Sequence, residues 1–255
     1  MKVGKQTPLE RYLSILETIA ASSSGLLAAD IAGHSGLPVA TTHRMLQTMR
    51  RAGLVDSEGG RAQGFRIGER LLRLVHSGQD SAWLKIAVQP ILSAMAEELA
   101  ETCFLTRLVG SKIVSLAWAT PGHGQTGYVV PGSVMPPHAA ASAKAVLAFQ
   151  PANLQNMALV GPLPQFTQQT KTDKAEIKHE YASIRRCGYA TCWNEIEIGL
   201  GAVAVPITIP NLGAIYSLAV SGLTERIARR PIDSTVLVLR ERASALVPIL
   251  RNHSG

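Results

Sequence analysis

The segment from residue 38 to residue 53 constrains the fold of this 255-residue chain more than any other segment. A proline suits the first turn of a helix and Gly53 is a typical helix end, so the spacing predicts a helix between them. Met45, Leu46 and Met49 fall on one side of this helix. The other side carries mostly polar and basic residues, namely Ala40, His43, Arg44, Gln47, Arg50 and Arg51. The helix contains no acidic residue, so we expect one apolar face and one cationic face.

Short elements surround this cationic helix. An apolar stripe predicts a first helix over 9–20, and a second short helix over 27–35 ends at Gly36. After the cationic helix, the pattern predicts two short strands joined by a Gly-Gly turn, over 54–57 and 62–67. Three helices followed by a hairpin are typical of a winged-helix domain.

The first domain carries a dense positive charge. Residues 1–78 hold ten Lys or Arg against six Asp or Glu, out of a net charge of +7 for the whole chain. A helix fits the major groove, where donors on its outer face reach base edges and phosphates. We therefore expect binding to double-stranded DNA; the alternative is a charged face that serves solubility alone. The expected contact residues are Thr41, Thr42, His43, Arg44, Gln47, Arg50 and Arg51 of the helix, with Arg61 and Arg66 of the hairpin.

Length and composition bound the remaining possibilities. With 46% hydrophobic residues, the chain can form two packed domains, which we place at 1–78 and 79–255. No apolar run reaches the roughly 18 residues needed to cross a bilayer, so we expect no membrane association and a cytoplasmic location. Three cysteines without C-x-x-C spacing predict reduced thiols, and histidines without a zinc motif predict no metal and no cofactor.

The second domain alternates helical and extended patterns. We expect a helix over 83–101 with a kink at Pro90. Further helices are predicted over 141–149, 173–186 and 232–250, and strands over 103–109, 113–119, 127–130, 201–207 and 214–220. The links between the first three strands are too short for parallel crossovers. The pattern thus predicts an α+β domain with an antiparallel sheet.

Ordered motifs run along nearly the whole chain. They are Ser35-Gly36-Leu37-Pro38, Thr41-Thr42-His43-Arg44, Gly53-Leu54-Val55, Phe65-Arg66-Ile67-Gly68, Pro131-Gly132 with Pro136, His138 and Lys144, and Gly188-Tyr189 with Glu195, Glu197, Gly199 and Pro206. In this order they resemble the IclR family of bacterial transcriptional regulators. The resemblance implies a winged helix-turn-helix domain, then a GAF-like effector-binding domain. Because one winged helix reads only a few base pairs, we also expect a homodimer or homotetramer.

Two positions of the first domain depart from the family's pattern. Leu27 stands where the family has a Thr or Ser that caps the second helix, so some capping stability is missing. Val39 stands where the family favours a basic or polar residue, which removes one phosphate contact. The exact DNA register therefore does not carry over from the family, whereas DNA binding does.

The resemblance also implies a small-molecule effector in the second domain. Its lining, carried over residue by residue, is Met135, Ala141, Ser142, Cys192, Leu200, Ala202, Ala219 and Ser221. The family commonly has an acidic residue, a cysteine and a serine at the positions of Cys192, Ala202 and Ala219. This drift toward apolar side chains favours a bulkier, aromatic effector whose acid group is held by Ser221 and backbone N–H donors. The alternative is that these residues are tight core packing.

Enzymatic activity is the remaining class to consider. The chain lacks G-x-S-x-G, a phosphate loop and G-x-G-x-x-G, although His123, His138, Glu195 and Glu197 could supply an acid/base pair. The pattern instead places His138 in a packed loop and both glutamates facing solvent beside a strand. We therefore expect a regulator and not a hydrolase, with a ligand-independent dimeric DNA-binding protein as the alternative.

Overall fold

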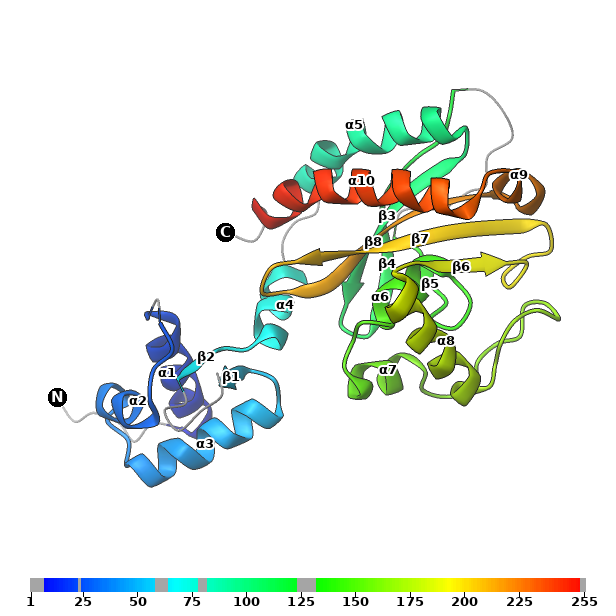
Figure 1. The fold of residues 1–255 in the computed structure, drawn as a ribbon. Helices are drawn as coiled ribbons and strands as arrows, with labels where there is room; N and C mark the ends of the chain where they lie inside the picture. The colour runs from blue at the N-terminus through cyan, green and yellow to red at the C-terminus, as the bar shows by residue number, and fades with distance from the viewer. Residues whose placement is uncertain (1–6, 23, 58–63, 78–81, 123–131, 253–255) are drawn as a thin grey trace. The chain divides into compact units, whose positions relative to one another are not determined.

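The computed structural model describes residues 7–22, 24–57, 64–77, 82–122 and 132–252. The chain divides into two compact units, Met1–Val75 and His76–Gly255. Figure 1 shows a helical first unit and a second unit built on a sheet.

The first unit holds three helices, a hairpin and a connecting helix. They are α1 (Pro8–Ala20), α2 (Ala28–Ser35), α3 (Val39–Arg51), β1 (Val55–Ser57), β2 (Phe65–Ile67) and α4 (Glu69–Ser77). β1 and β2 pair antiparallel, so the predicted winged-helix order is confirmed. The core gathers apolar side chains from every element but α4: Ile15, Ile19, Ile31, Met45, Leu46, Met49, Val55 and Phe65.

Local signals at the helix ends explain these boundaries. The side chains of Thr7 and Glu10 form a reciprocal capping box that starts α1. Leu27 begins α2 without a side-chain hydrogen bond, which confirms the missing cap expected from the sequence. Gly36 ends α2 with φ +66°, a left-handed conformation that glycine adopts without strain, and this turn leads into α3.

In the described residues, the second unit is a six-stranded antiparallel sheet with helices on both faces. Its strand order is β5-β4-β3-β8-β7-β6. The strands are β3 (Thr102–Val109), β4 (Lys112–Ala119), β5 (Val134–Met135), β6 (Ala190–Trp193), β7 (Leu200–Ile209) and β8 (Gly213–Leu223). The helices are α5 (Ala82–Leu99), α6 (Ala141–Leu147), α7 (Ala152–Ala158), α8 (Lys174–Cys187), α9 (Thr224–Arg229) and α10 (Ile232–Asn252).

Two layers of helices enclose this sheet. α10 packs on β7, β8 and α5, while α6 packs on β6, β7 and β8. In Figure 1, α5 and α10 lie on one side of the sheet, and α6, α7 and α8 lie on the other. The predicted α+β class with an antiparallel sheet is therefore confirmed.

Four short elements of the second unit escaped prediction, namely β5, β6, α7 and α9. Each has seven residues or fewer, which is too short for an apolar period to be visible. Pro90 lies inside α5, and that helix continues to Leu99. The strand predicted over 127–130 lies outside the described residues.

Candidate functional site

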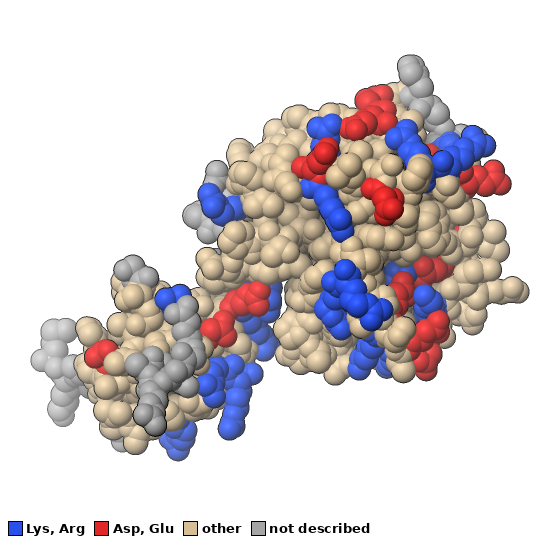
Figure 2. Space-filling model, viewed as in Figure 1, with Lys and Arg blue, Asp and Glu red and all other residues tan. Residues whose placement is uncertain are grey.

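The outer surface of α3 is the first candidate site. His43, Arg44, Arg50 and Arg51 are exposed on it, and Thr41 and Gln47 are half-buried. Met45, Leu46 and Met49 are buried on the opposite side, as the helical spacing predicts. In Figure 2, basic side chains gather over α3. The exposed face of this helix therefore presents donors without an acidic residue.

Thr42 was predicted to contact DNA, but the structure places it in the interior of the domain. Its side chain is fully buried, and its Oγ1 has no hydrogen-bond partner among the residues that the structure describes. The reason is helical phase, because position 42 lies three and four residues before the buried Met45 and Leu46. Thr42 therefore packs inside the domain and does not present its hydroxyl to DNA.

Contacts from arginines join α3 to the elements after it. Arg50 Nη1 donates to Ser57 Oγ of β1 at 3.3 Å, and Arg70 Nη1 donates to the carbonyl of Ala52 at 2.9 Å. Arg66 is exposed on β2. Arg61, the other predicted hairpin contact, lies outside the described residues. The first bond joins β1 to α3, and the second joins α4 to the residue that follows α3.

The second candidate site is the sheet face predicted to bind an effector. Cys192 lies opposite Ala202, and Ala202 lies opposite Ser221, so the three side chains share a face. Leu200 and Ala219 are each two residues from a member of this row and point to the same face. Five predicted lining residues from three strands are thus brought together.

The same face extends across β3, β4 and β5 and is covered by α6. Ser217, two residues before Ala219, donates to the carbonyl of Ser142 at 2.9 Å, which places α6 over this face. We call it the α6 face. Met135 lies opposite Ile113, which lies opposite Leu108, so by register it joins the same face. Among the eight predicted residues only Met135 and Leu200 are half-buried; the other six, from Ala141 to Ser221, are buried.

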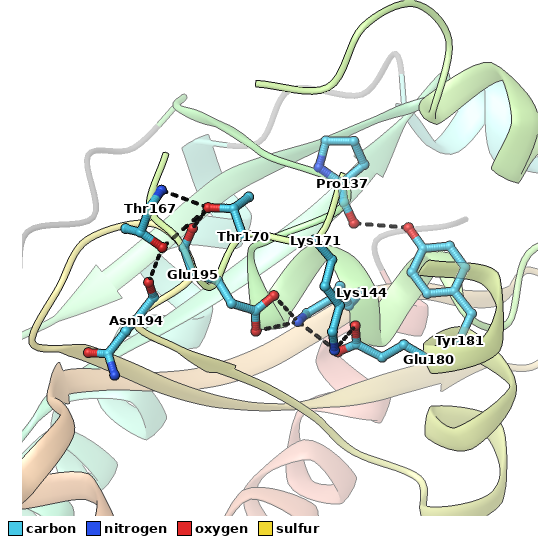
Figure 3. Close-up of polar contacts among 9 residues, drawn as sticks. All are labelled: Pro137, Lys144, Thr167, Thr170, Lys171, Glu180, Tyr181, Asn194 and Glu195. Atoms are coloured by element: carbon cyan, nitrogen blue, oxygen red, sulfur yellow. Dashed lines mark hydrogen bonds and ion pairs between the residues drawn. The ribbon is translucent and has the colours of Figure 1, made fainter. Parts of the chain in front are cut away.

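A buried charged network borders the α6 face. Lys144 of α6 is fully buried, and its Nζ lies 2.7 and 2.8 Å from the two carboxylate oxygens of Glu195. The same Nζ lies 2.8 Å from Glu180 of α8, whose second oxygen is 2.9 Å from Lys171. Figure 3 shows the four side chains converging from three segments. Two cations and two carboxylates make the network neutral.

This network corrects one expectation. The sequence pattern places Glu195 facing solvent, but its side chain is buried because it neutralises the desolvated Lys144. Glu197 is exposed, as predicted. A lone lysine between Ala143 and Ala145 was the sequence signal for a buried cation, since apart from Ser142 the rest of that helix is apolar.

Hydrogen bonds hold neighbouring loops onto the network. Thr170 Oγ1 donates to the carbonyl of Glu195 at 2.6 Å, and Thr167 Oγ1 donates to the carbonyl of Asn194 at 2.6 Å. Tyr181 donates its hydroxyl to the carbonyl of Pro137 at 2.9 Å. The loop before α8 is therefore fixed to the turn after β6, and α8 itself is fixed to the segment that leads into α6.

Burial and charge act in opposite directions on the network's pKa values. Burial raises the pKa of Glu195, and Lys144 offsets only part of that shift. Burial alone would also raise the pKa of Glu180, but Lys144 and Lys171 together lower it below its ordinary value. Burial, followed by the nearby Glu195 carboxylate, raises the pKa of the Cys192 thiol. Cys192 of the predicted effector lining thus senses the charges of this network.

His138 belongs to a packed loop, as expected. It is fully buried, its Nε2 lies 2.9 Å from the carbonyl of Pro164, and its ring stacks on Phe166 at 5.6 Å between centroids. No bond links this ring to Glu195 or Glu197 within the described ranges. Within those ranges, also, no group of three or more His, Cys, Asp or Glu side chains could hold a metal ion.

A cavity of about 470 Å³ opens elsewhere, between α5 and β4. Lys85, Gln89 and Ser93 line it from the helix, and residues 116–120 line it from the strand. None of the predicted effector residues is part of this lining. Among the described helices, none is long and apolar enough to cross a membrane.

The fold defines a class of protein: a winged-helix unit joined to a separate unit built on an antiparallel sheet. Residues 8–59 match the IclR helix-turn-helix domain, and residues 78–247 match the bacterial transcriptional regulator IclR C-terminal domain. The chain belongs to the IclR family of transcriptional regulators. This is a family of DNA-binding proteins without enzymatic activity, as the sequence predicts.

Individual relatives are similar over most of their length. The HTH-type transcriptional regulator BhcR of Paracoccus denitrificans is 29% identical, covering 94% of this chain and 87% of BhcR. The HTH-type transcriptional regulator TtgV of Pseudomonas putida is 31% identical, covering 86% of this chain and 82% of TtgV. An IclR homologue from Microbacterium hydrocarbonoxydans, complexed with 4-hydroxybenzoate, superposes with a TM-score of 0.60 at 24% identity, covering 96% and 99% of the two chains.

Proposed function

We propose that this transcriptional regulator binds double-stranded DNA in a sequence-specific way and responds to a small organic acid, aromatic in character. α3 and the hairpin contact the DNA, and the α6 face binds the effector. The observation that carries the proposal is the α6 face itself, where six residues from four strands share one surface beneath the helix that holds Ala141 and Ser142.

The charge of α3 supports its role as the reading helix. Its exposed side chains include His43 and Arg44 near the start, where a recognition helix meets base edges. Arg50 and Arg51 lie toward its end, beside the hairpin. A regulator of this kind acts where bacterial DNA is, so the cytoplasm is its expected location.

The hairpin arginines should act on phosphates. Arg66 is exposed on β2, and Arg61 precedes it in the sequence. Replacing both with alanine should weaken DNA binding regardless of sequence and reduce the slope of log affinity against log salt by about 0.9 per contact removed. Anisotropy titrations of a selected DNA duplex at four salt concentrations measure this slope. A double variant that keeps the wild-type slope would exclude the hairpin from the interface.

Two copies of the chain should bind one operator. The first unit exposes apolar side chains on α1 and α4, with Leu9, Leu13 and Leu74 at 68%, 48% and 53% exposure. Paired copies would cover such apolar surface and would supply two half-sites on the DNA. We therefore propose a homodimer or homotetramer, which sedimentation of the full chain measures directly.

The side chains of the α6 face favour an effector that has an apolar ring and one polar end. Ala202 and Ala219 provide small apolar side chains, and Ser221 provides a hydroxyl in the same rows. Lys144 is the nearby buried cation, but two carboxylates already neutralise it. The structural neighbour complexed with 4-hydroxybenzoate supports an aromatic acid as the class of effector.

Added bulk at Ala202 should block the effector. This side chain is 7% exposed and lies in one row between Cys192 and Ser221, so a phenyl ring there occupies the proposed site. Ala202→Phe should lose the thermal shift that an effector acid causes, while DNA affinity without effector stays within about twofold. Thr208→Phe is the matched control, because Thr208 is exposed on the same strand. Equal acid binding by Ala202→Phe and wild type would place the site elsewhere.

A thermal-shift screen of aromatic and aliphatic acids, each followed by a DNA-binding titration, tests the whole proposal. We expect at least one acid to raise the melting temperature and to change DNA affinity. If no acid does either, the chain is a ligand-independent dimeric DNA-binding protein, and the α6 face is core packing.

A further inference from the structure

A row of hydroxyl side chains crosses the middle of the α6 face. Ser115 lies opposite Thr106, and Thr106 lies opposite Ser217, on β4, β3 and β8. By register this row falls between the row of Ala219 and the row that ends in Met135. With Ser142 of α6 above it, we call the four residues the hydroxyl cluster. All four are at most 2% exposed.

Two of the four hydroxyls in the hydroxyl cluster form hydrogen bonds, and the other two are unpaired among the described residues. Ser217 Oγ donates its one proton to the carbonyl of Ser142 at 2.9 Å. Thr106 Oγ1 lies 2.7 Å from Ser217 Oγ, so Thr106 must be the donor in that bond. The hydroxyls of Ser115 and Ser142 are buried and have no partner within the described part of the chain.

Unpaired buried hydroxyls are uncommon because each loses its bonds to water on folding. An alanine at either position would avoid that cost. On α6 itself, the neighbouring positions Ala143 and Ala145 are already alanine and are buried, so the helix accepts this residue. Ser115 lies on the α6 face and Ser142 lies on the helix that covers it. Two such donors, beside a row already expected to bind an effector, indicate a ligand group that accepts hydrogen bonds.

We propose that the Ser115 and Ser142 hydroxyls donate to the carboxylate of the effector, which rests on the function proposed above. The neutral Lys144 network neither repels the carboxylate nor pairs with it, since Glu195 and Glu180 already occupy that ammonium. The Ser115 and Ser142 hydroxyls therefore orient the acid group, in place of the Ser221 hydroxyl expected from the sequence, and the ring lies toward Ala219 and Ala202. Ser115, Thr106 and Ser217 extend the site beyond the residues carried over from the family.

The first test needs no ligand. If the two hydroxyls are unpaired, Ser115→Ala and Ser142→Ala should each raise the melting temperature of the ligand-free protein, by about 2 °C. Ser217→Ala is the matched control and should lower it, because Ser217 makes two hydrogen bonds. If all three variants lower the melting temperature alike, Ser115 and Ser142 already bind something such as a buried water, and the proposal is wrong.

The second test measures acid binding by calorimetry, with benzoate and pyruvate as probes. Ser115→Ala and Ser142→Ala should each weaken binding of the acid that the wild type binds by about tenfold or more. If the wild type binds an acid, Ala202→Phe does not, and both serine variants bind it as tightly as wild type, only the hydroxyl assignment fails. If the wild type binds neither acid, the carboxylate assignment fails together with the acid effector proposed above.

Discussion

Replacing Arg44 with alanine should weaken binding to a selected DNA duplex by ~1–3 kcal/mol, which is about 5- to 150-fold in Kd. Arg44 is exposed on α3, and the helix is fixed from behind by Met45 and Met49. A guanidinium in this position can donate two hydrogen bonds to a guanine edge, and alanine removes both. Fluorescence anisotropy at one fixed salt concentration measures the change.

A matched control separates base reading from charge. Arg229→Ala removes one exposed positive charge from α9 in the second unit and should leave DNA affinity nearly unchanged. Circular dichroism should show wild-type helix content in both variants, since neither side chain is part of the core. Unchanged affinity of a folded Arg44→Ala protein would mean that α3 is not the reading helix.

Replacing Lys144 with methionine should destabilise the second unit by ~3–5 kcal/mol. The substitution leaves the buried Glu195 carboxylate without its partner and leaves Glu180 with Lys171 alone. Denaturant unfolding of the full chain, followed by tryptophan fluorescence, measures the loss. Lys178→Met is the control, because Lys178 is exposed on α8 and its loss should change stability by less than about 0.5 kcal/mol.

A double variant tests whether the charges are coupled. Lys144→Met with Glu195→Leu removes both members of the buried pair, so it should recover much of the stability that Lys144→Met loses. If the losses of unfolding free energy from the two substitutions are instead additive, Lys144 and Glu195 are not coupled, and the lysine acts through packing alone.

The pH dependence of the network has a defined sign. The pKa of Glu180 is lowered in the folded chain, so its stabilising contribution is present above the ordinary carboxyl pKa and is lost as pH falls through the lowered value. The difference in melting temperature between wild type and Glu180→Gln should therefore be largest near pH 7 and shrink below about pH 4.

The first unit could be predicted well because its signals are local. α1, α2 and α3 each combine an apolar stripe with an end signal, and Gly36 and Gly53 mark the ends of two of them. Thr42 was misplaced because the expected contact set followed a motif, whereas burial follows helical phase. Position 42 lies three residues before Met45 and seven before Met49, so the helical period places it on their buried side.

The candidate site in the second unit could be predicted only in part. The family motifs pointed to residues that the register does bring to one face, such as Ala202 and Ser221. The hydroxyl row did not emerge, because its register depends on an irregularity between Leu105 and Thr106 where β3 pairs with β4. The partners of Lys144 come from segments 36 and 51 residues away, a distance at which local patterns carry no information.

An acid bound on the α6 face should change DNA binding by the first unit. The most direct measurement is the Kd of wild type and Ala202→Phe for one selected DNA duplex, with and without a saturating acid from the screen. A ligand shifts an equilibrium only by its differential affinity for two states, so coupling must appear as a ratio of Kd values. We predict a ratio of about fivefold or more for wild type and one near unity for Ala202→Phe. Equal ratios in the two proteins, or a wild-type ratio of one with a bound acid, would contradict the claim.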